Sequence, residues 1–137
     1  MLLYAYDSDS DSPRHAPCAA WLSDALTGTE EVGLWFGVAL GSIRLATHPV
    51  IWARPMPTTD AIAIVRSWLA RPQVRLLQPT ETYWETLQAV ALDSRAVSSV
   101  VMDAHLAALA RERGATVATT DRDVRRFTGV RLFDPSV

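Results

Sequence analysis

The stretch Val100–Asp123, V-V-M-D-A-H-L-A-A-L-A-R-E-R-G-A-T-V-A-T-T-D-R-D, decides the fold of this chain of 137 residues. It predicts a nearly all-apolar helix that carries one acid, Asp103, and stops at Gly114 before a short β-branched strand. Two further acids, Asp121 and Asp123, follow that strand. A carboxylate in an apolar helix is costly to bury unless a cation compensates it. Acids beyond the carboxyl end of a strand lie where open α/β sheets bind ligands. The stretch therefore predicts a divalent-metal site built from carboxylate oxygens.

Short apolar segments alternate with helical segments along the rest of the chain. Strands are predicted at 1–6, 31–35, 74–77, 115–119 and 130–133, and helices at 12–27, 36–47, 58–70, 79–94, 100–113 and 123–127. In the helix at 58–70, Ile62, Val65 and Leu69 lie on one apolar face, and Thr58 or Thr59 is the predicted N-cap. This alternation is typical of βαβ units and predicts a parallel sheet with helices on both faces. We expect one domain over residues 1–137, with its first strand truncated.

Composition excludes several classes of protein. Hydrophobic residues make up 49% of the chain, which favours a folded domain over disorder. No uncharged apolar run reaches eighteen residues, and no secretory leader is recognisable, so we expect a cytoplasmic protein without a membrane segment. The single Cys18 excludes an internal disulfide. The net charge of −2 does not indicate a nucleic-acid binder. The thirteen basic residues are all arginine, which fits either phosphate recognition or a GC-rich genome.

Several motifs resemble those of the PIN-domain nucleases, specifically the VapC toxins of bacterial toxin–antitoxin pairs. They are L-L-Y-A-Y-D with S-P-R-H, I-R-L-A-T-H-P, S-W-L-A-R-P and, most specifically, D-A-H-L-A-A-L-A…G-A-T-V…T-D-R-D. The resemblance covers nearly the whole chain. It implies a three-layer α/β/α sandwich around a short parallel sheet. It also implies a Mg²⁺- or Mn²⁺-dependent endoribonuclease that hydrolyses RNA, is neutralised by a small antitoxin protein and forms a homodimer.

The resemblance also implies which residues form the site. Two of the family's four metal-binding acids correspond to Asp103 and Asp121, with Asp123 as an accessory ligand. The first acid of the family would lie just ahead of the L-L-Y motif, before Met1, and the second falls on Gly41. Because two carboxylates hold Mg²⁺ only weakly, we expect weak metal binding and poor activity. An alternative is a catalytically impaired PIN-fold remnant that acts as an antitoxin-binding or dimerisation module. An in-frame acid motif upstream of Met1 would favour the enzyme.

Each candidate ligand also has a structural interpretation. Asp103 lies near the positive end of its helix, so we expect a depressed pKa and an ionised side chain; alternatively it pairs with Arg44. Asp121 is either a metal ligand or the N-cap of the short helix that follows, and the two roles are compatible. Asp123 fits a cap or turn residue as well as an accessory ligand.

A basic cluster follows the last two acids. Arg122, Arg125 and Arg126 lie next to the predicted site, where they either contact the RNA backbone or form a solvated surface. The sequence does not distinguish between these two interpretations.

Overall fold

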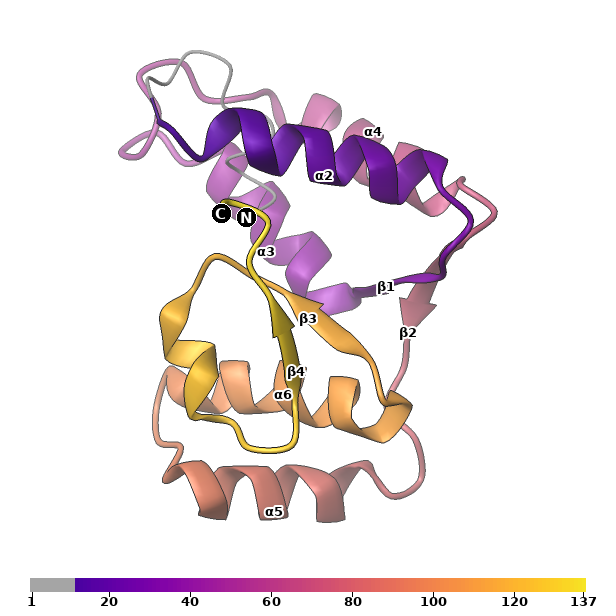
Figure 1. Cartoon of the computed structure of the whole chain (residues 1–137). Coiled ribbons are helices and arrows are strands. Elements are labelled where there is room, and N and C mark those ends of the chain that lie inside the picture. Colours follow the sequence, from indigo (N-terminus) through magenta and orange to yellow (C-terminus); the bar gives the residue numbers. More distant parts are fainter. Residues whose placement is uncertain (1–11) are drawn as a thin grey trace. The chain divides into compact units, whose positions relative to one another are not determined.

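The computed structural model describes residues 12–137 (Figure 1). In chain order its elements are α2 (His15–Thr27), β1 (Val32–Trp35), α3 (Phe36–Ala46), α4 (Thr58–Leu69), β2 (Val74–Leu77), α5 (Tyr83–Ser94), α6 (Val100–Arg113), β3 (Thr116–Ala118), the 3₁₀ helix η1 (Arg122–Arg126) and β4 (Arg131–Phe133). Each corresponds to an element predicted from the sequence. The largest difference is at α5, which begins at Tyr83 instead of residue 79. The predicted strand at 1–6 lies outside the described residues.

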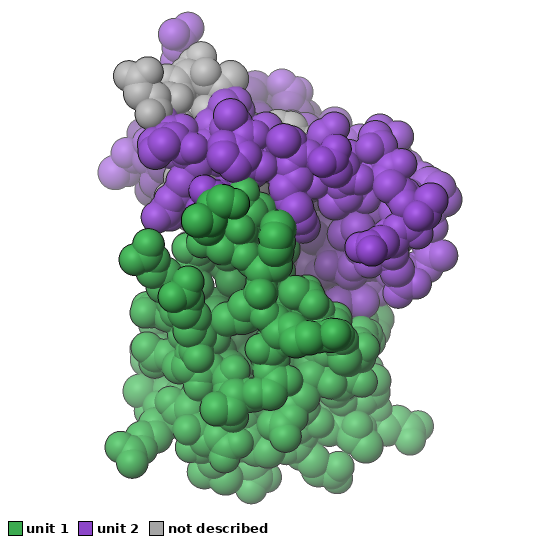
Figure 2. Space-filling view, in the orientation of Figure 1, with its two compact units in different colours: residues 1, 78–135, 137 green, residues 2–77, 136 purple. Residues whose placement is uncertain are grey.

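The chain divides into two compact units (Figure 2). Residues 2–77 make up nearly all of one, called here the N-terminal unit, and residues 78–135 nearly all of the other, the C-terminal unit. In the described part of the chain, each unit contains one two-stranded parallel sheet. The single domain expected over residues 1–137 stays a prediction.

The sheet of the N-terminal unit pairs β1 with β2, with Val32 opposite Val74 and Trp35 opposite Leu77. Between these strands the chain passes through α3 and α4, because parallel neighbours need a long crossover connection. The helices and the sheet bury a common apolar cluster. Its buried members are Leu22, Leu34, Ala39, Val65, Trp68 and Val74.

The buried face of α4 differs from the predicted one. Ala61, Val65 and Trp68 are buried, whereas Ile62 and Leu69 are 43% and 37% exposed. Both sets follow helical spacing around Val65, so the pattern alone does not separate them. The face with Trp68 is buried because an indole removes far more apolar surface from water than a leucine side chain. The predicted threonine cap is also wrong. Pro57 occupies the N-cap position, and no side chain makes a capping hydrogen bond there.

The C-terminal unit is built around α6, which lies alongside α5 in Figure 1. Its central residues are completely buried: Ala104, Ala107, Ala108 and Leu109 are each 0% exposed. Small alanine side chains allow close helix packing. The helix ends as predicted at Gly114, which has φ +58° in the left-handed region. The chain then enters β3, which pairs in parallel with β4.

Alternating helices and parallel strands confirm the predicted α/β class. Among residues 12–137, no helix combines the length and the hydropathy needed to cross a bilayer.

Candidate active site

Asp103 lies in the first turn of α6 and is half-buried. The next residue, Ala104, belongs to the core of the C-terminal unit. Ser99 occupies the N-cap position of α6, but its side chain makes no capping hydrogen bond. The acid thus projects from the edge of a tightly packed helix, a support that restricts its movement.

Asp121 is held at the start of η1 by two local hydrogen bonds. Its backbone N–H donates to Thr119 Oγ1 at 3.1 Å, and its Oδ1 accepts the backbone N–H of Asp123 at 2.8 Å. It is the N-cap of η1, which confirms the capping role predicted from the sequence. Thr119 is itself anchored, because its N–H donates to the carbonyl of Phe133 at 2.9 Å. The end of β3 therefore fixes the position of the Asp121 carboxylate.

The fold brings the three predicted acids into electrostatic contact. The pKa of Asp103 is raised, first by burial and then by the negative charges of Asp121 and Asp123. The cation that opposes this effect is Arg126, which lowers the same pKa. All four residues belong to the C-terminal unit. Residues separated from Asp103 in sequence by most of α6, a strand and a loop therefore act on its carboxyl group in the folded chain.

The expected direction of the Asp103 pKa was wrong. A position near a helix N-terminus favours the ionised carboxylate, and the depressed pKa was expected from that position alone. In the structure, burial and the negative charges of Asp121 and Asp123 raise the pKa of Asp103 more than Arg126 lowers it. The alternative interpretation paired Asp103 with Arg44. The cation that shifts its pKa is instead Arg126, within the same unit.

The donor set suits a hard divalent cation. A doubly charged ion would offset most of the negative charge of the three carboxylates, and carboxylate oxygens are the protein ligands that Mg²⁺ prefers. Within residues 12–137, however, no three side chains of His, Cys, Asp or Glu form a compact metal-binding group. Asp121 and Asp123 are both exposed, and Asp121 already accepts a hydrogen bond. The described residues thus present a pair or loose trio of acids and not a closed cage.

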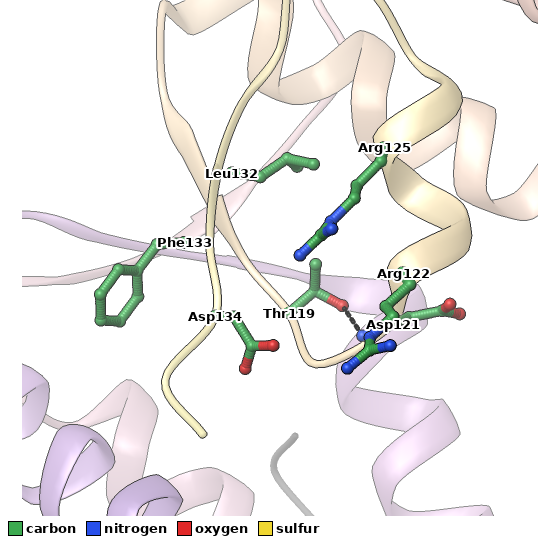
Figure 3. Close-up of a pocket in the computed structure, with 7 residues that line it drawn as sticks. All are labelled: Thr119, Asp121, Arg122, Arg125, Leu132, Phe133 and Asp134. Atoms are coloured by element: carbon green, nitrogen blue, oxygen red, sulfur yellow. Dashed lines mark hydrogen bonds between the residues drawn. The ribbon is translucent and has the colours of Figure 1, made fainter. Parts of the chain in front are cut away.

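A small pocket of about 160 Å³ adjoins Asp121 (Figure 3). The pocket, called here the arginine pocket, is lined by Thr119, Asp121, Arg122, Arg125, Leu132, Phe133 and Asp134. In Figure 3 the guanidinium of Arg125 extends into it between Leu132 and Thr119, and the Phe133 ring points away from the arginines. The pocket therefore joins η1 to β4 immediately beside a candidate metal ligand.

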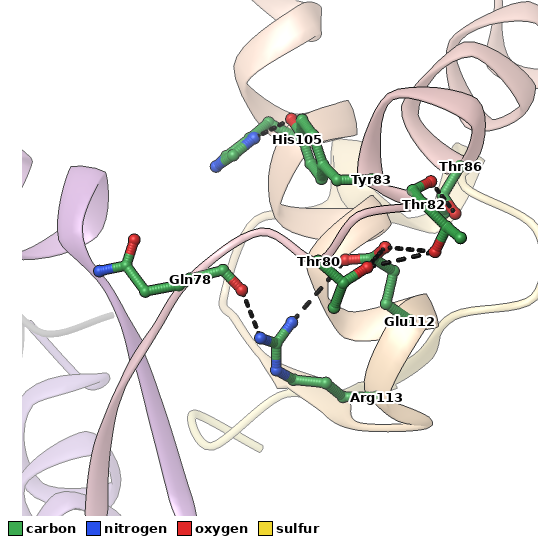
Figure 4. A network of polar contacts seen from close by, with 8 residues as sticks. All are labelled: Gln78, Thr80, Thr82, Tyr83, Thr86, His105, Glu112 and Arg113. Carbon is green, nitrogen blue, oxygen red and sulfur yellow. Dashed lines mark hydrogen bonds and ion pairs between the residues drawn. The ribbon is translucent and has the colours of Figure 1, made fainter.

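A polar network ties the two long helices of the C-terminal unit together (Figure 4). Glu112, near the end of α6, has a side chain that is only 3% exposed, and it accepts hydrogen bonds from the hydroxyls of Thr80 and Thr82, ahead of α5. The Tyr83 hydroxyl, at the start of α5, hydrogen-bonds with His105 Nδ1. These contacts fix α6, and with it Asp103, against α5.

Sequence reasoning missed two of these supporting residues. Thr119 shows a local signal, because a hydroxyl two positions before Asp121 is typical of a turn in which it accepts the backbone N–H. Glu112 shows none. It lies between Arg111 and Arg113, a charged run that is typical of a solvated helix end, and only the tertiary fold covers its carboxylate.

Comparison with known proteins places the chain in a family. Residues 1–130 match the family model described as PIN domain. Ribonuclease VapC37 of Mycobacterium tuberculosis is 38% identical over 135 residues, which cover 98% of this chain and 92% of that protein. Ribonuclease VapC33 of the same species is 33% identical over 135 residues, or 98% of this chain and 93% of that protein. Ribonuclease VapC48 is 35% identical over 125 residues, or 90% and 86% respectively.

These matches confirm the resemblance that the sequence motifs suggested, and with it the predicted fold class, an α/β sandwich of three layers with short parallel strands. The family match covers most of the chain, and the relatives match at 33–38% identity. The chain therefore belongs to the PIN-domain family.

Proposed function

We propose that this chain is a divalent-metal-dependent endoribonuclease that acts as the toxin of a toxin–antitoxin pair. The observation that carries the proposal is the approach of Asp121 and Asp123 to the half-buried Asp103, whose pKa their charges raise, within one compact unit. Similarity to proteins named ribonucleases over most of the chain supports the class of reaction. The alternative of a non-catalytic remnant gains no support from these relatives.

In this proposal Asp103 and Asp121 hold Mg²⁺ or Mn²⁺, and Asp123 is the accessory ligand. A cation bound there supplies a water of lowered pKa and a positive charge facing the phosphate. The protein's contribution is positioning. The hydrogen bond from Asp123 N–H orients Asp121, and the packed helix α6 orients Asp103. Arg126 offsets part of the negative charge that remains around Asp103.

The partners follow from the same proposal. The substrate is RNA, the inhibitor is a cognate antitoxin protein, and the active form is a homodimer in the cytoplasm. Exposed apolar side chains on α5 and α6 offer surface for such contacts: Trp84 is 75% exposed and Met102 57%.

RNA cleavage by purified protein tests the proposal. We expect cleavage with Mg²⁺ or Mn²⁺ and none with EDTA. Asp103→Asn and Asp121→Asn should each lower the rate by about 100-fold or more, since even the outer partners of metal ligands cost 10–100-fold when they are removed. Asp93→Asn is the matched control, because Asp93 is exposed on α5 and carries the same charge. Cleavage that persists in EDTA, or full activity of Asp103→Asn, would contradict the proposal.

A further inference from the structure

The arginine pocket presents two guanidinium groups on one side of η1. A 3₁₀ helix has three residues per turn, so side chains three apart eclipse one another. Arg122 and Arg125 have this spacing and both line the pocket. Arg126, one residue further, does not line it; its Nε donates to the backbone carbonyl of Asp123 at 3.2 Å. The short helix therefore separates its three arginines into a pair that faces the pocket and one that lies by the acids.

Neither arginine of the pair is neutralised by an ion pair within the described part of the chain. Within residues 12–137, Arg122 and Arg125 form no ion pair, although Asp121 and Asp134 line the same pocket. Both arginine side chains are exposed. Charge pairing among residues 12–137 therefore does not explain why both arginines line this pocket.

The size of the pocket limits what it can accept. At about 160 Å³ it is smaller than the roughly 300–1,000 Å³ of pockets that enclose a whole small-molecule ligand. One anionic group such as a phosphate is therefore a better match than a complete nucleotide. Guanidinium groups recognise phosphate by paired N–H donors, and the half-buried Thr119 adds a polar side chain to the pocket lining.

We propose that Arg122 and Arg125 bind a backbone phosphate of the RNA next to the phosphodiester that is cut. This inference rests on the proposed ribonuclease function. The pocket shares Asp121 with the candidate metal site, so a phosphate held by the arginines lies at the edge of that site. The two arginines thereby set the position of the RNA strand relative to the carboxylates. They are positioning residues. They do not contribute to sequence specificity, because phosphate contacts orient a nucleic acid without identifying its bases.

The salt dependence of RNA binding tests this subsite separately from cleavage. Binding of a fluorescein-labelled single-stranded RNA is measured by anisotropy at several salt concentrations, with Asp103→Asn in every variant to prevent cleavage. Each phosphate contact to single-stranded nucleic acid contributes about 0.7 to the slope of log K against log salt. We expect Arg122→Ala and Arg125→Ala each to reduce that slope by about 0.7. Arg125→Lys should keep the slope and bind more weakly than arginine.

Arg66→Ala is the matched control, since Arg66 is exposed on α4 and its removal changes the net charge equally. Equal slopes for Arg122→Ala, Arg125→Ala and Arg66→Ala, in variants with unchanged circular dichroism, would overturn the subsite. That result leaves cleavage by the wild-type chain intact, whereas failure of the proposed function would appear as absence of cleavage by the wild-type chain itself.

Discussion

Asp103 is held where its charge is unfavourable for the fold. Burial and the carboxylates of Asp121 and Asp123 all raise its pKa, and Arg126 opposes them. Because the folded protein favours the protonated form, the stability associated with Asp103 increases as the pH falls through this raised pKa and decreases as the pH rises. Groups with such perturbed pKa values occur preferentially at functional sites.

Asp103→Asn should therefore increase the free energy of unfolding in the absence of metal. Asparagine resembles the protonated acid in size and removes the repulsion by Asp121 and Asp123. The measurement is urea denaturation at pH 7 in EDTA, with Asp93→Asn as a control that leaves stability unchanged. A less stable Asp103→Asn protein would mean that the repulsion is not the dominant effect at this position.

At the scale of residues, the sequence predicts which acids come together better than it predicts the pKa of Asp103. Asp103 lies at the start of a helix, and Asp121 follows the strand after that helix. In a parallel α/β fold these two positions lie at the same edge of the sheet, so the approach of the two acids can be predicted. The direction of the pKa shift does not follow, because it depends on how much surface Asp103 loses and on the distances to three other charges. Those quantities exist only in the folded chain.

Helix ends position the site at the scale of elements. Gly114 terminates α6 with φ +58°, and the chain turns from there into β3, which leads to Asp121. A side chain at Gly114 would meet nothing within 4 Å, so glycine is required by the backbone conformation and not by space.

Gly114→Ala should destabilise the protein by about 1–2 kcal/mol, the cost of placing a Cβ in the left-handed region. Gly41→Ala is the matched control, because Gly41 lies inside α3 and an added Cβ also meets nothing within 4 Å. There alanine should stabilise by about 0.5–1 kcal/mol. Chemical denaturation of both variants measures these changes. Equal effects at the two glycines would show that the left-handed turn is not what selects Gly114.

The bounds of helices and strands were predicted well where a proline or glycine marks them. They were predicted poorly where a contact with a distant helix determines them. The bounds of β2 and the end of α6 agree with the sequence because Pro72 precedes the strand and Gly114 follows the helix. The start of α5 was placed too early, since Thr80 and Thr82 use their hydroxyls to bind Glu112 from a distant helix. No local pattern contains that contact.

At the scale of the whole molecule, alkaline titration depends on very few groups. The chain has no lysine, three tyrosines and one cysteine. The pKa of Tyr83 is raised from its ordinary value of 10.0, mainly by burial and also by the carboxylate of Glu112. The stability associated with Tyr83 is therefore complete below pH 10 and is lost as the pH rises through the raised pKa.

A titration followed by tyrosinate absorbance should show one tyrosine that ionises at a higher pH than an ordinary phenol. Tyr83→Phe should remove that tyrosine from the titration. It should also flatten the decrease in unfolding free energy above pH 10. At pH 7 the same variant should be less stable by about 0.5–1.5 kcal/mol, since the hydrogen bond to His105 is lost. If all three tyrosines of the wild-type protein ionise together near pH 10, the raised pKa is contradicted.

The fold class of the whole molecule could be predicted from the sequence. The division of the chain into two compact units could not. The alternation of helices and short apolar strands indicates α/β by period and length alone. The division near residue 77 leaves no local signal, because neither a long linker nor a shift in composition marks it. Likewise, the arginine pocket combines η1 with β4, and only pairing of β3 with β4 brings these segments together.

The most direct test is a double-mutant cycle on Mn²⁺ affinity, measured by electron paramagnetic resonance, with Asp103→Asn, Asp121→Asn and the double variant. If both carboxylates hold one ion, each single substitution should weaken affinity about 10-fold or more, and the double variant should lose little beyond either single one. Two losses that multiply independently, or an affinity that is unchanged by both substitutions, would show that Asp103 and Asp121 do not share a metal ion.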